Sequence, residues 1–137
     1  MHACVLVADD GEIYELLNRF ARYDEDEEKP DALWDYFGIG GRFEGALPLK
    51  KRRLRRFLGV IPVGWSSEAS IARKYEVDCD RFLHDAPVVG LYFRGELHMC
   101  PFTLTDDAAI ASWQQKFRLM FAEIPEDSTL RIIDAHS

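Results

Sequence analysis

The hydrophobic and polar positions near the start of the chain follow first a strand period and then a helix period. Residues 3–8 form a short apolar run rich in β-branched side chains, which predicts a buried strand. A helix that ends near Tyr23 is expected next, with Asp9 and, three residues later, Glu12 as its capping pair. Its apolar face is formed by Ile13, Leu16, Leu17 and Phe20.

The last third of the chain has the clearest pattern. Two apolar runs, 87–93 and 97–102, flank Arg94-Gly95-Glu96 and predict a β-hairpin, in which Pro101 indicates an edge strand or a bulge. An amphipathic helix is then expected between a Thr105 cap and Pro125. Its apolar stripe is Ile110, Trp113, Phe117, Met120, Phe121 and Ile124. Residues 129–135 are predicted to form the final strand.

Without residues 24–85, the predicted order is strand, helix, strand, strand, helix, strand. This order favours an α+β fold of the ferredoxin-like β-α-β-β-α-β type, an antiparallel sheet with helices packed on one face. Residues 24–85 are then a large insertion after the first helix. The length of 137 residues fits a single domain over 1–137.

Composition adds expectations about location and cysteine chemistry. The first apolar run is too short for a signal peptide or a membrane span, so a cytoplasmic location without a membrane partner is expected. Three scattered cysteines, an odd number, indicate reduced and mostly buried thiols. No Gly-x-Ser-x-Gly or His-Glu-x-x-His motif occurs, so the sequence supports neither an enzyme nor a cofactor.

Charge is unevenly distributed along a chain of net charge −7. One acidic run predicts a solvated loop: Asp24, Glu25, Asp26, Glu27 and Glu28. One basic run over 50–56 begins with Lys50, Lys51, Arg52 and Arg53. Both are candidate partner-binding segments, and the basic run could bind nucleic acid directly or neutralise the acidic run. The acidic remainder favours a basic protein partner, including nucleic-acid-binding complexes, over broad contact with nucleic acid.

A glycine-rich loop is the main candidate site. Residues 38–45 contain four glycines and Arg42, a combination suited to gripping a phosphate or a carboxylate. Neighbouring aromatic side chains could stack on a base. The candidate ligand- or partner-binding residues are Trp34, Asp35, Tyr36, Gly40, Gly41 and Arg42. The alternative is a tight turn between aromatic core anchors, in which Arg42 pairs with Asp35 or Glu44. The spacing matches neither the dinucleotide fingerprint nor the P-loop.

Asp134 and His136 form a second, weaker candidate. Residues two apart on a strand face the same side, so this pair could bind a metal or act as a general base. The alternative is a polar pair without a ligand. His98 and Cys100 repeat the same spacing on the hairpin, where a metal site would need Cys79 or His84 nearby; a packed cysteine and a surface histidine is the favoured interpretation.

The segment from Trp34 to Gly45 reads WDYFGIGGRFEG, which resembles W-D-[WY]-[YF]-x-I-G-G-R-[WF]-x-G. This pattern marks an uncharacterised family of small proteins from bacteria, phages and prophages. The resemblance continues in residues 72–78 and 124–136. One departure lies after the hairpin turn, where residues 95–101 lack the Gly-Glu-Met-Gly of family members. The resemblance implies a setting on mobile elements rather than a reaction.

Two functions are therefore expected from the sequence. The first is a non-enzymatic interaction protein of the phage or mobile-element type, which binds and modulates a host or defence protein or nucleoprotein complex. The alternative is a small nucleotide- or nucleic-acid-binding protein, or an enzyme, that uses the Arg42 loop.

Overall fold

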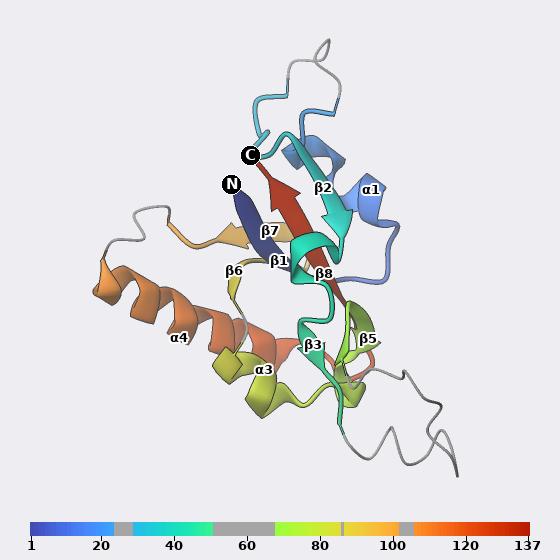
Figure 1. Ribbon diagram of the computed structural model, residues 1–137, viewed down its shortest axis with the longest axis vertical. Helices are drawn as coiled ribbons and strands as arrows, with labels where there is room; N and C mark the ends of the chain where they lie inside the picture. Colours follow the sequence, from blue (N-terminus) through green and yellow to red (C-terminus); the bar gives the residue numbers. More distant parts are fainter. Residues whose placement is uncertain (24–28, 51–67, 86, 102–105) are drawn as a thin grey trace.

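The computed structural model describes residues 1–23, 29–50, 68–85, 87–101 and 106–137. Their main sheet has the strand order β2-β8-β1-β6-β7, and β5 also pairs with β8 (Figure 1). Its strands are β1 (His2–Ala8), β2 (Tyr36–Ile39), β5 (Ile71–Arg73), β6 (Val88–Phe93), β7 (Glu96–Met99) and β8 (Thr129–His136). A small second sheet pairs β3 (Leu47–Pro48) with β4 (Glu68–Ala69). The α-helices are α1 (Ile13–Leu17), α3 (Cys79–Asp85) and α4 (Asp107–Glu123). The predicted α+β class is confirmed.

The strand order differs from the ferredoxin-like prediction. In that fold an antiparallel strand separates the two parallel strands of a split βαβ unit. Here β1 and β6 are direct parallel neighbours, and the hairpin places β7 outside β6. The physical reason lies in burial: β6 is buried along almost its whole length and fits an interior position, whereas β7 is only half-buried and forms an edge. The edge position expected from Pro101 is confirmed.

The helices cover both faces of the sheet, so the prediction that they pack on one face is wrong. Alternate residues of β1 point to opposite faces. Cys4 and Leu6 face a core with α3 and α4, whereas Val5 and Val7 face a core with α1. Figure 1 shows α3 and α4 to one side of the strands and α1 to the other. The helices pack on both faces because each apolar face of a sheet must be buried against another element.

Residues 24–85 are integrated into the fold rather than appended to it. β2 and β5 lie end to end along the edge of β8 that faces away from β1. Ile132 links them, because its carbonyl accepts from Gly40 N and its N–H donates to Ser70 O. The same stretch supplies core residues to both faces, among them Trp34 and Phe82. The predicted acidic run 24–28 and the basic residues Lys51, Arg52 and Arg53 lie outside the described residues; Lys50 is exposed.

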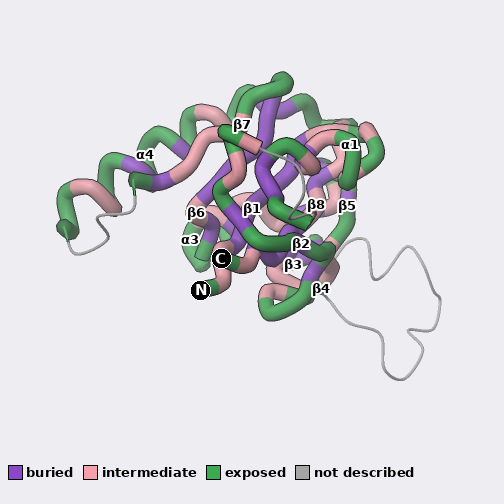
Figure 2. The backbone as a smooth tube through the Cα atoms, turned by 90° about the horizontal axis from the view of Figure 1, so that it is seen from above, coloured by how far each residue is buried: buried purple, intermediate pink, exposed green. Residues whose placement is uncertain are grey.

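Local signals predicted α4 and the hairpin well, whereas the first helix is shorter than predicted. Helix α1 ends at Leu17 and a 3-10 turn, Asn18–Phe20, follows it, so the helix does not reach Tyr23. Helix α4 buries Trp113, Phe117 and Phe121, and Figure 2 shows buried and exposed stretches alternating along it. The hairpin turns through positive φ at Arg94 and Gly95, as a two-residue turn requires. Glu12, not Asp9, caps α1 by accepting from Tyr14 N and Glu15 N, because Asp9 instead accepts from Gly11 N.

Helix α4 is capped by Asp106, which accepts from Ala108 N, while the predicted cap Thr105 lies outside the described residues. No helix in the described part of the chain has the length and apolar character needed to cross a bilayer.

Candidate functional site

The glycine-rich loop closes over a carboxylate of the protein itself. After β2, the chain turns at Gly40 into a short 3-10 helix, Gly41–Phe43. This turn brings the backbone N–H of Arg42 to 2.9 Å from Oδ2 of Asp134 on β8. Successive backbone N–H groups of this kind form an anion-binding concavity. The anion that this loop binds in the structure is Asp134.

The glycines of the loop are required by its geometry. Gly40 and Gly41 have φ values of 75° and 51°, which are costly for residues with a side chain. A Cβ on Gly41 would also lie 2.5 Å from Oδ2 of Asp134. The backbone can therefore reach the carboxylate only without a side chain at position 41. This favours the tight-turn interpretation for the glycines themselves.

The second oxygen of Asp134 binds a histidine that the sequence analysis did not single out. Nδ1 of His2, the first residue of β1, lies 2.8 Å from Oδ1 of Asp134. Burial by itself raises the pKa of Asp134. The hydrogen bond from Arg42 N, the hydrogen bond from His2 and the charges of His2 and Arg42 outweigh it, so the pKa lies below its usual value. Asp134 is thus a buried, ionised carboxylate with both oxygens engaged.

His136 and Tyr36 complete the cluster. The His136 ring meets the His2 ring edge-on at 4.7 Å between centroids, and Tyr36 stacks on His136 at 4.7 Å with an interplanar angle of 10°. Direct cross-strand pairing brings these residues together: His136 lies opposite both His2 and Tyr36. Nδ1 of His136 is buried without a hydrogen-bond partner. Two imidazoles, a tyrosine and an arginine-bearing loop therefore surround Asp134.

This arrangement joins the two sites that the sequence suggested separately. Tyr36, Gly40, Gly41 and Arg42 meet Asp134 and His136 at one end of the sheet. Asp35 is exposed and donates its backbone N–H to His136 O. Trp34 does not join them, because it is buried against Phe20 in the core on the α1 face.

A metal ion has little to bind in this cluster. Among the residues that the structure describes, no three His, Cys, Asp or Glu side chains are arranged to hold one. On the hairpin, Cys100 is buried while the His98 ring faces Glu96 at 3.7 Å, so that pair does not form a joint site.

Sequence reasoning missed His2 because its partner is remote. His2 lies just before the predicted strand 3–8, so the sequence pattern did not place it on the sheet. Its contact with Asp134 depends on the antiparallel pairing of β1 with β8, 132 positions apart for the two bonded residues. No local pattern carries that information.

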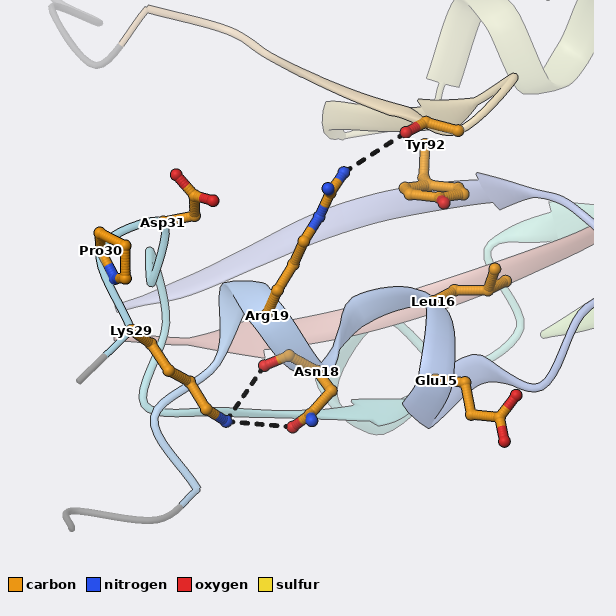
Figure 3. A pocket seen from close by; sticks show the side chains of 9 residues that line it. Glu15, Leu16, Asn18, Arg19, Lys29, Pro30, Asp31 and Tyr92 are labelled. Atoms are coloured by element: carbon orange, nitrogen blue, oxygen red, sulfur yellow. Dashed lines mark hydrogen bonds between the residues drawn. The ribbon is translucent and has the colours of Figure 1, made fainter. Parts of the chain in front are cut away.

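Several hollows formed by the described residues, including two large ones, lie away from this cluster. The larger, of about 570 Å³, has Arg19 and Lys29 in its wall (Figure 3). Both cations are used internally: Lys29 Nζ donates to Asn18 and Ala21, and Arg19 donates to Gly95 O. The second, of about 460 Å³, lies where β2 and β5 meet. Its lining residues are Ile39, Glu44, Gly45, Glu68, Ala69, Ser70 and Ile71.

Comparison of the chain with protein-family models, with curated proteins and with solved structures finds no match.

Proposed function

We propose that this chain is a non-enzymatic interaction protein of the phage or mobile-element type, which binds and modulates a host or defence protein or nucleoprotein complex. The observation that carries the proposal is the hollow at the β2–β5 edge, where apolar side chains are exposed beside carboxylates.

The apolar part of this edge consists of Ile39 and Ile71, which are 45% and 50% exposed. Ile39 lies opposite Ile133 and Ile71 lies opposite Arg131, so both stand on the same face of the sheet. Large apolar side chains that remain exposed next to a hollow are typical of a surface covered by a partner.

The acidic part of the edge favours a basic partner. Glu44, which is exposed, lines the same hollow, and the whole chain has a net charge of −7. Complementary charge speeds association and disfavours wrong partners. The partner segment that fits best has an apolar side chain between Lys or Arg residues, which is common in proteins that bind nucleic acid.

The contact is expected to use side chains rather than an added strand. The Tyr23 hydroxyl donates to Phe37 O and accepts from Phe37 N, so it occupies the outward backbone groups in the middle of β2. An edge covered in this way is protected from pairing with another strand. The neighbouring glycine loop, held by Asp134, gives the hollow a fixed wall.

The test is an affinity purification from a host lysate, followed by measurement of the purified partner's affinity. Ile39→Asp and Ile71→Asp place a charge in the contact and are each expected to weaken binding at least about tenfold. Leu119→Asp on α4 is the matched control, because Leu119 is an exposed apolar residue remote from the hollow. Equal binding by all three variants would refute the proposal.

A further inference from the structure

A second binding function follows from the cluster around Asp134. His2, Tyr36 and His136 stand on three neighbouring strands, β1, β2 and β8, as direct cross-strand partners on one face of the sheet. The loop that carries Arg42 closes over the same face. Groups that donate to anions and rings that stack are therefore concentrated in one place, independently of the hollow between β2 and β5.

Asp134 orients His2 rather than competing for a ligand. Its two oxygens are taken by His2 Nδ1 and by Arg42 N. A carboxylate that holds one ring nitrogen fixes the tautomer and leaves the other nitrogen for a ligand. His2 Nε2 is thus an acceptor when the ring is neutral and a donor when it is protonated.

His136 supplies an independent indication of a ligand. Its Nδ1 is buried and has no hydrogen-bond partner, although its ring is held between the edge of His2 and the face of Tyr36. Buried polar atoms in proteins are nearly always paired, to protein or to water, so this nitrogen is a position where an added group could complete the hydrogen bonding.

Tyr36 extends the cluster towards solvent. His136 covers one face of its ring, yet Tyr36 remains 47% exposed. Aromatic rings of this kind are stacking platforms for nucleobases, and the attraction does not depend on which base is bound. Imidazolium and guanidinium groups are the matching donors for a phosphate.

We propose that His2, His136, Tyr36 and Arg42 bind a nucleoside phosphate, with the base stacked on Tyr36 and the phosphate held by Arg42 and the imidazoles. The backbone N–H of Arg42 takes no part, because Asp134 already occupies it. The ligand is either a free nucleotide or the end of a single strand, since both present the same chemistry.

The experiment is a titration of the full chain, followed through the ring signals of its four histidines by NMR. The probes are adenosine monophosphate, inorganic phosphate and a short 5′-phosphorylated single strand. Saturable shifts of His2 and His136, with tighter binding of the nucleotide than of phosphate, are expected. Binding of the strand but not the nucleotide would identify a strand end as the source. Unchanged His2 and His136 signals with every probe at millimolar concentration would overturn the proposal.

Variants separate the two parts of the ligand. Arg42→Gln keeps the backbone bond to Asp134 and is expected to weaken binding of both nucleotide and phosphate about tenfold. Tyr36→Leu is expected to weaken nucleotide binding and to leave phosphate binding unchanged. The control is His84→Ala, since His84 forms an exposed pair with Asp85 at 2.7 Å and lies outside the cluster. Equal loss of both ligands in Tyr36→Leu would overturn the stacking role. None of these variants alters Ile39 or Ile71, so this result and the test of the partner surface are independent.

Discussion

Among the residues that the structure describes, two charged side chains of opposite sign are buried, Asp134 and Lys74, which are 9% and 5% exposed. Both bind backbone groups from a distant segment. Asp134 accepts from Arg42 N at 2.9 Å, and Lys74 Nζ donates to Phe121 O and Ile124 O at 2.9 and 2.7 Å. Each holds a different segment in place: Asp134 holds the glycine loop, and Lys74 holds residues 72–78 against the end of α4.

The two sites differ in whether the groups bound to the buried charge keep a further atom that can make a hydrogen bond. Lys74 binds the carbonyls at the C-terminal end of α4, where a cation is favoured by the helix dipole, and lies over the Phe121 ring. The charged partner of Lys74, Glu126 at 3.6 Å, is an exposed carboxylate at the protein surface. Asp134 instead binds His2, which keeps a second ring nitrogen and touches His136. Lys74 therefore mainly fixes the packing of two segments through backbone carbonyls. Asp134 also orients an imidazole whose second nitrogen can contact a ligand.

The sharpest test of the Asp134 site is Gly41→Ala. A positive φ and a Cβ clash with Asp134 Oδ2 act together, so we expect a loss of about 3 kcal/mol in the free energy of unfolding. Urea unfolding measures it. Gly38→Ala is the matched control in the same segment, because a Cβ there meets nothing within 4 Å. If the control were equally destabilised, the close fit of the loop to Asp134 would not be the cause.

Lys74→Met tests the other side of the comparison. The variant keeps an apolar stem but removes the Nζ donor from the Ile124 carbonyl and leaves the Phe121 carbonyl with only the Ile124 N–H. A loss of about 2 kcal/mol in the free energy of unfolding is expected. Thermal and urea unfolding should agree. Lys116→Met, at an exposed position of α4, should change stability by less than about 0.5 kcal/mol. Nucleotide titration should be unaffected by Lys74→Met; a loss there would mean that the two sites are coupled.

Asp134→Asn gives a pH signature. Its carboxyl pKa is lower folded than unfolded, so the ionised group stabilises the protein above the unfolded pKa of about 3.9, and this contribution is lost as pH falls through the folded pKa. The variant should lose about 1.5 kcal/mol at neutral pH and less at acid pH, where the two proteins converge. Urea unfolding across the acid range measures this. A constant difference between them would contradict the pKa assignment. Asp85→Asn, in the exposed pair with His84, is the control.

The smallest effect concerns Cys4, which lies opposite Asp134 in the sheet. Burial, and secondly the charge of Asp134, raises the pKa of the Cys4 thiol to about 12. Alkylation under native conditions, followed by mass spectrometry, should therefore modify the half-buried Cys79 before Cys4. Because burial is the larger cause, Asp134→Asn should accelerate Cys4 modification only slightly. Rapid modification of Cys4 in the wild-type protein would show that this end of the sheet opens readily.

Several helices and strands of this protein could be predicted from the sequence, because the local pattern of apolar residues indicates which side chains are buried. The stripe Trp113, Phe117 and Phe121 predicted α4, and the turn residues Arg94 and Gly95 predicted the hairpin. The glycine loop was recognised as the main candidate, and Asp134 with His136 as a second one. The helix caps were misplaced: Asp9 accepts from Gly11 N ahead of the helix, whereas Glu12 accepts from the first N–H groups of α1.

What only the tertiary structure decided was which segments meet. Strand periodicity shows that β1 has two apolar faces, but not that β6 is its direct parallel neighbour or that α1 and α4 take opposite faces. Likewise the sequence contains His2, Arg42 and Asp134, yet their contact depends on strand register between the two ends of the chain. Local patterns by themselves determined the first strand, the hairpin, α4 and the last strand, but not the strands within 24–85. Pairing across more than a hundred residues is set by the packing of all the elements together, and it is this pairing that builds the site.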